Sequence, residues 1–312
     1  MEPKPTIWID TDTGVDDAFA LLCAAMLDRQ GKVKLAGVSA VCGNVEQEKT
    51  YKNARNVLHL AGRSDIPVYP GAINPLKRAL RTAVHAHGQD GIGGAYLEES
   101  PAAHEACKAW DALYDCARKT EGGLDLILVG PQTNAAIAFQ KHPDLRQYIR
   151  QILIMGGALE GGNITDHAEF NIYVDPEAAK EVFALDLPMT MFGLDVTMKA
   201  RLLRADIDGI EVGSGRGNRL FREATAIAQG FYRQYVADCY CCHDLCPVLY
   251  LAYPDLFKGK ETVIDVVTED GIYLGQTRSV EKTTTRKNTV YAVDEVDREQ
   301  FASLVKECIN SI

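Results

Sequence analysis

Short apolar runs alternate with amphipathic stretches through the first two thirds of the chain. The apolar runs have strand length and predict strands at residues 6–10, 33–41, 124–129, 151–156 and 188–193, with a short one at 68–69. The stretches between them show helical periodicity at 47–61, 101–119 and 176–184. Strands separated by helices form parallel units, so the pattern predicts an α/β fold with an open, mostly parallel, doubly wound sheet flanked by helices.

The last third has a different pattern. Residues 262–268, 271–278 and 288–293 resemble a β-meander, which predicts a small antiparallel element added late, and a final helix is expected near 297–309. No low-complexity linker or internal repeat interrupts the 312 residues. We therefore expect a single domain over residues 1–312.

The overall composition excludes several kinds of partner. A net charge of -10 argues against nucleic acid and against an anionic membrane. No apolar run reaches the roughly 18 residues that a membrane span needs, and the first residues do not resemble a signal peptide. Nine cysteines, an odd number, fit reduced thiols better than a disulfide framework. These features predict a cytoplasmic protein.

The segment from Asp10 to Asp17 holds the most informative chemistry. Four aspartates, at positions 10, 12, 16 and 17, lie within eight residues at a predicted strand-to-helix turn. Asp16 and Asp17 could be ordinary acids in the first turn of a helix, but Asp10 and Asp12 end a buried strand, where carboxylates are unfavourable. Oxygen ligands without histidine or thiol suit a hard cation such as Ca²⁺ or Mg²⁺.

Other polar residues follow the remaining predicted strands. They lie in residues 41–44, 129–134 and 193–197, and in the long loop 157–173, which carries Asn163, Glu169 and Asn171. Because ligands bind at the carboxyl ends of the strands in doubly wound folds, we expect these segments to meet in one crevice. The amide and carboxylate groups suit a polyhydroxylated ligand, although singly each could serve only a turn.

Three further features have two interpretations each. His87 lies in a glycine-rich loop, 74–96, and could be exposed or functional. Cys239, Cys241, Cys242 and Cys246 crowd near His243; the segment is expected to be continuous helix, with buried structural cysteines favoured over a metal site. Asp244 could cap the apolar helix 245–252, or it could lie next to the Asp10–Asp17 cluster in the folded chain. Tyr232 and Tyr235, one helical turn apart, fit a base pocket or the core.

The whole chain resembles the inosine–uridine-type nucleoside hydrolase family. Asp10-Thr11-Asp12-Thr13-Gly14-Val15-Asp16-Asp17 is similar to the family's DxDPGxDD signature, with Thr13 in place of proline. Further matches follow in the family's order: Gly43-Asn44, His87-Gly88, Gly130-Pro131-Gln132-Thr133-Asn134, Met155-Gly156-Gly157, Glu169-x-Asn171, Asp195-Val196-Thr197 and His243-Asp244.

The resemblance implies a Ca²⁺-dependent N-ribohydrolase that forms ribose and a free nucleobase. In that scheme Asp12, Asp17, Asp244 and the Val129 carbonyl hold Ca²⁺. Asp16 is the general base on a metal-bound water, which attacks directly, and Asp10 supports its neighbours. The ribose would be bound by Asn44, Met155, Asn163, Glu169 and Asn171. His87 and His243 would face the base, with His243 as acid. The family also implies a homodimer or homotetramer acting on a small ribonucleoside.

Two other functions compete with this one. A haloacid dehalogenase-type Mg²⁺-dependent phosphatase also has two aspartates two apart after a strand, but it gives Asp16, Asp17, Glu169 and His243 no role. A nucleoside-binding protein without catalysis is the second alternative, which turnover of inosine and uridine would separate from an enzyme.

Overall fold

A central sheet determines the architecture. The computed structural model describes residues 4–283 and 288–312. Nine strands form one sheet in the order β10-β9-β11-β6-β5-β4-β1-β2-β3, and β7 pairs with β8 in a second, two-stranded sheet. The strands are β1 Thr6–Thr11, β2 Lys34–Ala40, β3 Val68–Pro70, β4 Leu124–Leu128, β5 Ile149–Met155, β6 Met189–Phe192, β7 Arg201–Leu203, β8 Cys239–Cys241, β9 Phe257–Val266, β10 Thr277–Val280 and β11 Val290–Val296.

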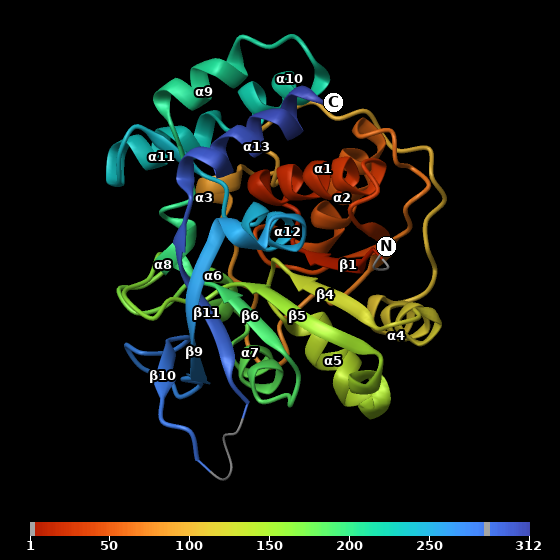
Figure 1. Cartoon of the computed structure of the whole chain (residues 1–312), viewed down its shortest axis with the longest axis vertical. Coiled ribbons are helices and arrows are strands. Elements are labelled where there is room, and N and C mark those ends of the chain that lie inside the picture. The colour runs from red at the N-terminus through yellow and green to blue at the C-terminus, as the bar shows by residue number, and fades with distance from the viewer. Residues whose placement is uncertain (1–3, 284–287) are drawn as a thin grey trace.

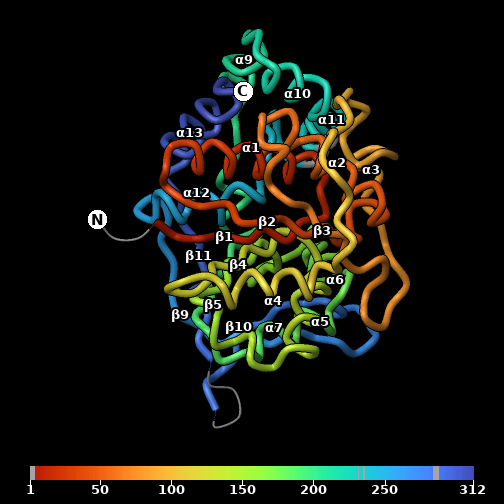
Figure 2. The backbone as a smooth tube through the Cα atoms, turned by 90° about the vertical axis from the view of Figure 1, so that its right-hand side faces the viewer, coloured from red at the N-terminus to blue at the C-terminus, as the bar shows by residue number. Residues whose placement is uncertain are grey.

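Helices cover both faces of this sheet (Figure 1). They are α1 Val15–Arg29, α2 Gln47–Leu60, α3 Val84–His87, α4 Ala109–Lys119, α5 Thr133–Lys141, α6 Phe170–Val174, α7 Pro176–Phe183, α8 Leu194–Thr197, α9 Arg204–Glu211, α10 Arg216–Ala224, α11 Ala226–Tyr235, α12 Leu245–Ala252 and α13 Arg298–Asn310. Figure 2 shows α1, α2, α12 and α13 on one side of the strands and α4, α5 and α7 on the other. This confirms the predicted α/β fold with a mostly parallel, flanked sheet.

The side chains of β1 show why the sheet is buried on both faces. Ile7 and Ile9 point into the core beneath α1, whereas Trp8 points into the opposite core beneath α4 and α5. Alternate residues of a strand face opposite sides, and a parallel sheet with helices on both faces needs apolar residues at every position. This explains why the predicted strands appear as continuous apolar runs.

The strand order locates the ligand crevice. From β3 to β6 the order is 3-2-1-4-5-6, and these strands are parallel. Asp10 in β1 is in register with Ser39 in β2 and Leu128 in β4, so the carboxyl ends of these strands meet at one edge. The direction of winding reverses between β1 and β4, which is where such folds bind ligands.

The late strands are antiparallel, as predicted, but they do not form a meander. A meander would place β10 between its sequence neighbours, whereas β9 lies in the middle and pairs antiparallel with both β10 and β11. β11 then pairs in parallel with β6 and so extends the main sheet. The pairing of β11 with the edge of β6 depends on a strand about a hundred residues earlier, so the pattern of residues within β11 does not reveal it.

Two other expected elements are wrong in part. The helix predicted over 101–119 begins only at Ala109, because side chains of α2 bind the preceding backbone: Asn56 accepts the Ser100 N–H, and Arg55 donates to the Ala102 carbonyl. The expected continuous helix through the cysteines is instead β8, whose Cys239 and Cys241 pair with β7. Its cysteines are free and buried, as predicted. Within the described ranges, no helix is long and apolar enough to cross a membrane.

Candidate active site

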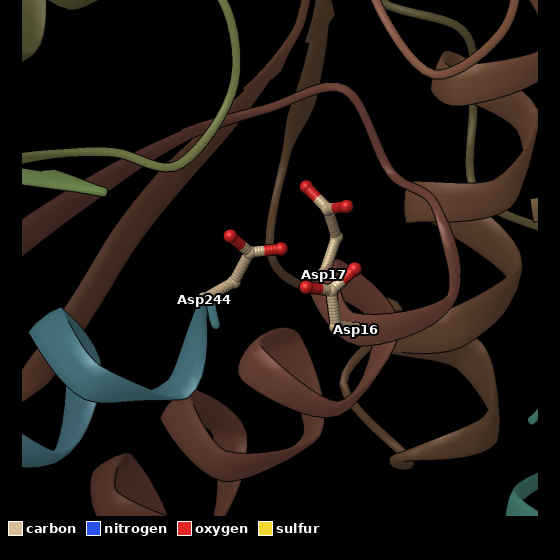
Figure 3. A group of neighbouring side chains, drawn as sticks. All are labelled: Asp16, Asp17 and Asp244. Carbon is tan, nitrogen blue, oxygen red and sulfur yellow. The ribbon is translucent and has the colours of Figure 1, made fainter. Parts of the chain in front are cut away.

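Three carboxylates from two distant parts of the chain meet at the crevice. Asp16 and Asp17 lie in the first turn of α1, and Asp244 immediately precedes α12. Each offers an oxygen, and these oxygens lie within 4.8 Å of one another. Figure 3 shows Asp244 facing the other two side chains. The Asp244 side chain makes no capping hydrogen bond to α12, so its position is not explained by helix capping.

Asp17 and Asp12 are held in fixed positions around this cluster. Asp17 accepts hydrogen bonds from the Thr11 hydroxyl at 2.6 Å, the Gly14 N–H at 2.9 Å and the Asn44 side-chain amide at 3.2 Å. One oxygen of Asp12 accepts the Asn44 N–H at 2.7 Å. Its other oxygen, Oδ1, is buried without a hydrogen-bond partner among the described residues. A buried oxygen of this kind is unfavourable unless something absent from the protein chain satisfies it.

Two glycines make room for the Asp12 carboxylate. A Cβ added at Gly43 would lie 2.1 Å from Asp12 Oδ2, and one added at Gly130 would lie 2.7 Å from Oδ1. Both glycines belong to segments that follow strands, β2 and β4. The turns after these strands therefore admit a carboxylate where any larger residue would displace it.

The electrostatics of the cluster favour a bound cation. Burial and the neighbouring carboxylates raise the pKa of Asp12 and Asp244 well above the usual value, and burial, with Asp17 beside it, raises the pKa of Asp16 to about 7. None of the ion pairs found in the described residues involves this cluster. A divalent ion would reverse these shifts. The orphaned oxygen and the oxygen-only donors thus fit a metal ion.

Asp10 lies behind this cluster. Its Oδ2 accepts hydrogen bonds from the Ser39 hydroxyl and, at 2.8 Å, from the Asn134 amide. Asn134 in turn accepts the Ala72 N–H at 2.7 Å. Burial raises the pKa of Asp10 to about 7. Asp10 therefore ties the ends of β1 and β2 to the start of α5, which suits a supporting position.

The cluster opens into a cavity of about 710 Å³. Residues from separate strand ends and loops line it: Asp16, Asn44, His87, Val129, Met155, Asn163, Glu169, Asn171, His243 and Asp244. Asp10, Asp12 and Asp17 are buried and do not line it. The volume is large enough for a nucleoside-sized ligand.

Glu169 and Asn171 also line the cavity. Glu169 precedes α6 and accepts N–H groups of Gly157 at 2.9 Å, Asn171 at 3.0 Å and Ile172 at 3.2 Å; burial raises its pKa to about 7. The Asn171 amide donates to the Val129 carbonyl at 2.9 Å. Asn163 accepts the Phe170 N–H at 2.9 Å. These side chains are therefore positioned before any ligand binds.

Two histidines also line the cavity. His87 Nδ1 accepts the Val15 N–H at 3.0 Å, so any hydrogen on the neutral ring is on Nε2. His243 Nε2 lies 2.6 Å from the Tyr232 hydroxyl, and its Nδ1 lies 2.8 Å from the Thr197 hydroxyl. Burial lowers the pKa of His87 to about 3 and that of His243 to about 4.

Sequence reasoning did not predict the two hydrogen-bond partners of His243, Tyr232 and Thr197. Tyr232 lines the cavity and also packs against the core, and the side chain of Tyr235 lies outside the described part. Thr197 follows β6 in the Asp195-Val196-Thr197 motif, and its place after a strand end was the available signal. Asp195 itself holds the cavity loop by accepting the Leu159 N–H at 2.8 Å and the Glu160 N–H at 3.2 Å.

This fold and this site define a known class. The family model described as inosine-uridine preferring nucleoside hydrolase matches residues 7–303. The chain belongs to this family of nucleoside hydrolases, enzymes that cleave N-glycosidic bonds. The match therefore does not support the haloacid dehalogenase-type alternative.

Individual relatives and solved structures agree with the assignment. The chain is 37% identical over 305 residues to a pyrimidine-specific ribonucleoside hydrolase RihA of Klebsiella pneumoniae, covering 96% of this chain and 97% of the relative. A plant nucleoside hydrolase, PpNRh1, superimposes with a TM-score of 0.91 at 29% identity, covering 99% and 100%. A purine-preferring ribonucleoside hydrolase from Gardnerella vaginalis gives a TM-score of 0.91 at 27% identity, covering 98% of each chain.

Proposed function

We propose that this chain, acting as one domain, hydrolyses the N-glycosidic bond of ribonucleosides to ribose and the free nucleobase, with a bound Ca²⁺ ion. The observation that carries the proposal is the meeting of the Asp16, Asp17 and Asp244 carboxylate oxygens within 4.8 Å, at the floor of a cavity of nucleoside size. Asp12 lies beside them with an unsatisfied buried oxygen. Family membership supports the same reaction.

The residues that would hold the ion are Asp12, Asp17, Asp244 and the Val129 carbonyl. Calcium takes six to eight oxygen ligands, so this set leaves positions for water and for the 2′- and 3′-hydroxyls of ribose. The Val129 carbonyl already accepts the Asn171 amide, and its second lone pair stays available. When bound, the ion supplies a Lewis acid that lowers the pKa of a water molecule and orients the sugar.

Asp16 has the properties of a general base. It is the one member of the Asp16, Asp17 and Asp244 group that is 8% exposed, against 0% and 3% for the others, and it lines the cavity. In the described part of the chain, the Thr11 and Asn44 side chains that donate to Asp17 are not partners of Asp16, which interacts with Asp244 and with the backbone of its own turn. An Asp16 oxygen that lines the cavity can therefore accept a proton from water. Water then displaces the base directly at the anomeric carbon, without a covalent intermediate.

Carboxylate and amide side chains that line the cavity would stabilise the sugar as the bond breaks. Cleavage passes through an oxocarbenium-like sugar, whose positive charge favours nearby carboxylates and amide oxygens. Glu169, Asn171, Asn163, Asn44 and Met155 all line the cavity. Their internal hydrogen bonds hold them in place, so little reorganisation is needed in the transition state.

Departure of the base requires a proton. A nucleobase leaves as a poor anion, and Tyr232 and His243, which both line the cavity, form a hydrogen-bonded pair that we place beside the base. Tyr232 donates its hydroxyl hydrogen to the departing base, and His243 Nε2–H, hydrogen-bonded to the Tyr232 oxygen, stabilises the phenolate that remains; His87 also lines this cavity. Because the relatives that are 35–37% identical are named pyrimidine-specific, we propose uridine and cytidine as the preferred substrates. The resemblance further implies a homodimer or homotetramer, and the free cysteines suit a reducing, cytoplasmic location.

A substrate panel tests this proposal. Uridine, cytidine, inosine, adenosine, their 2′-deoxy forms and p-nitrophenyl phosphate are incubated with protein treated with EDTA and then with Ca²⁺ or Mg²⁺ restored. We expect release of free base from ribonucleosides that EDTA abolishes and Ca²⁺ restores. Phosphate release with Mg²⁺ would favour the phosphatase. Calorimetric binding of uridine without turnover in Ca²⁺ would show a binding protein and refute the enzyme.

A further inference from the structure

The Asp195-Val196-Thr197 motif ends in a side chain for which the proposed reaction has no role. Thr197 lies in α8 and is completely buried. Its hydroxyl lies 2.8 Å from His243 Nδ1, and in the described part of the chain this is the hydroxyl's hydrogen-bond partner. A buried hydroxyl hydrogen without an acceptor is unfavourable, so the Thr197 hydroxyl donates to Nδ1.

This one bond determines the arrangement of the whole ring. If Nδ1 carried a hydrogen, both it and Thr197 would donate, and the threonine hydrogen would be left without an acceptor. Nδ1 therefore keeps its lone pair, and the hydrogen of the neutral imidazole is on Nε2. Nε2 lies 2.6 Å from the Tyr232 oxygen, so Nε2–H donates to it. The Tyr232 hydroxyl hydrogen must then point elsewhere.

Burial and the nearby Cys241 thiol raise the pKa of Tyr232 well above its usual value, and both residues line the cavity. Sulfur is a weak acceptor, so a nucleobase oxygen or nitrogen in the cavity is the better acceptor for the Tyr232 hydrogen. With Thr197 in place, the hydrogen bonds thus run in one direction, from Thr197 through His243 to Tyr232 and into the cavity. With the opposite arrangement the Tyr232 hydrogen would point back at His243.

We propose that Thr197 is a positioning residue for leaving-group protonation: its hydroxyl fixes the orientation and tautomer of His243 so that Tyr232 presents its hydrogen to the departing base. The inference rests on the proposed function, since it concerns the same reaction. It predicts that removal of the Thr197 hydroxyl lowers kcat only for substrates whose leaving group needs a proton, with little change in KM. A general loss of packing would instead slow all substrates alike.

The kinetic test compares Thr197→Val, which keeps the shape, with Thr197→Ser, which keeps the hydroxyl. For Thr197→Val we expect kcat on uridine to fall about tenfold to a hundredfold, a part of what a general acid contributes, with KM changed little. On p-nitrophenyl riboside, whose leaving group needs no proton, kcat should stay within about twofold. Thr197→Ser should restore most of the uridine activity. Equal losses on both substrates, or a serine variant as slow as the valine one, would overturn the proposal.

A spectroscopic test does not depend on turnover. Protein labelled with ¹⁵N-histidine gives distinct ring nitrogen signals for the two tautomers, and His243→Gln assigns those of His243. Wild type and Thr197→Ser should show a hydrogen on Nε2, and Thr197→Val should show loss of this preference. A hydrogen on Nδ1 in the wild type would refute the inference. Thr225→Val, which removes another fully buried hydroxyl, should change neither result. If wild type cleaves neither substrate, the proposed function fails, and the spectrum alone then decides the role of Thr197.

Discussion

Replacing Asp244 with asparagine should have opposite effects on stability with and without calcium. The carboxylates of Asp16, Asp17 and Asp244 approach within 4.8 Å, and two unit charges at that distance repel by about 3 kcal/mol at an effective dielectric constant of roughly 20. Proton uptake relieves part of this repulsion, because the pKa of Asp244 is raised well above its usual value. We therefore expect Asp244→Asn to stabilise the cation-free protein by about 1–3 kcal/mol near pH 8.

Calcium should reverse this order. A ligand at about a hundred times its Kd stabilises the folded state by about 3 kcal/mol, and the variant lacks one of the proposed ligands. Urea unfolding in EDTA and in Ca²⁺ measures both effects as changes in the free energy of unfolding. Wild type should gain in Ca²⁺, and Asp244→Asn should gain far less.

Another aspartate at a helix start provides the control. Asp297 precedes α13 and, unlike Asp244, accepts a capping hydrogen bond from the Gln300 N–H at 3.0 Å. Asp297→Ala should therefore lose about 1 kcal/mol equally in EDTA and in Ca²⁺. If Asp244→Asn is instead destabilised in EDTA, repulsion in the cluster is not what its carboxylate contributes. An undiminished response to Ca²⁺ would place the ion elsewhere.

Three further predictions concern single residues. Asp16→Ala should reduce turnover by orders of magnitude while Ca²⁺ still raises the unfolding midpoint; normal turnover would exclude Asp16 as the base. His243→Ala should slow uridine hydrolysis much more than that of p-nitrophenyl riboside, and equal rates of loss would argue against an acid role. Burial raises the pKa of Glu169 from 4.5 to about 7 in the folded protein. Its contribution to stability is thus fully present below pH 4.5 and lost as pH rises through about 7, by up to about 3 kcal/mol. In EDTA, the stability advantage of wild type over Glu169→Gln should shrink across this interval, and a constant difference would contradict the raised pKa.

The sequence predicted the main sheet well because its signals are local. Each parallel strand is buried on both faces, so it appears as an apolar run whatever its neighbours are, as Ile7, Trp8 and Ile9 illustrate. The β8 strand was missed because three residues give no clear period, and its pairing with β7 depends on residues about forty positions earlier. The placement of β9 between β10 and β11 was missed because it depends on the free edge of β6.

The same distinction holds for the site. The clustering of Asp10, Asp12, Asp16 and Asp17 is visible in the chain, since a strand-to-helix turn keeps neighbours in sequence together in space. The amino-acid sequence by itself also determined the apolar strands and the ordered motifs that indicate the family.

Only the tertiary structure decided which distant groups meet at the candidate site and which hydrogen bonds each of them makes. Burial of both faces of the sheet brings α12 against α1, and this turns the Asp244 carboxylate away from its own helix and toward Asp16 and Asp17. The contacts of Thr197 and Tyr232 with His243 arise in the same way, because hydrogen bonds between buried groups form only once packing has excluded water from them.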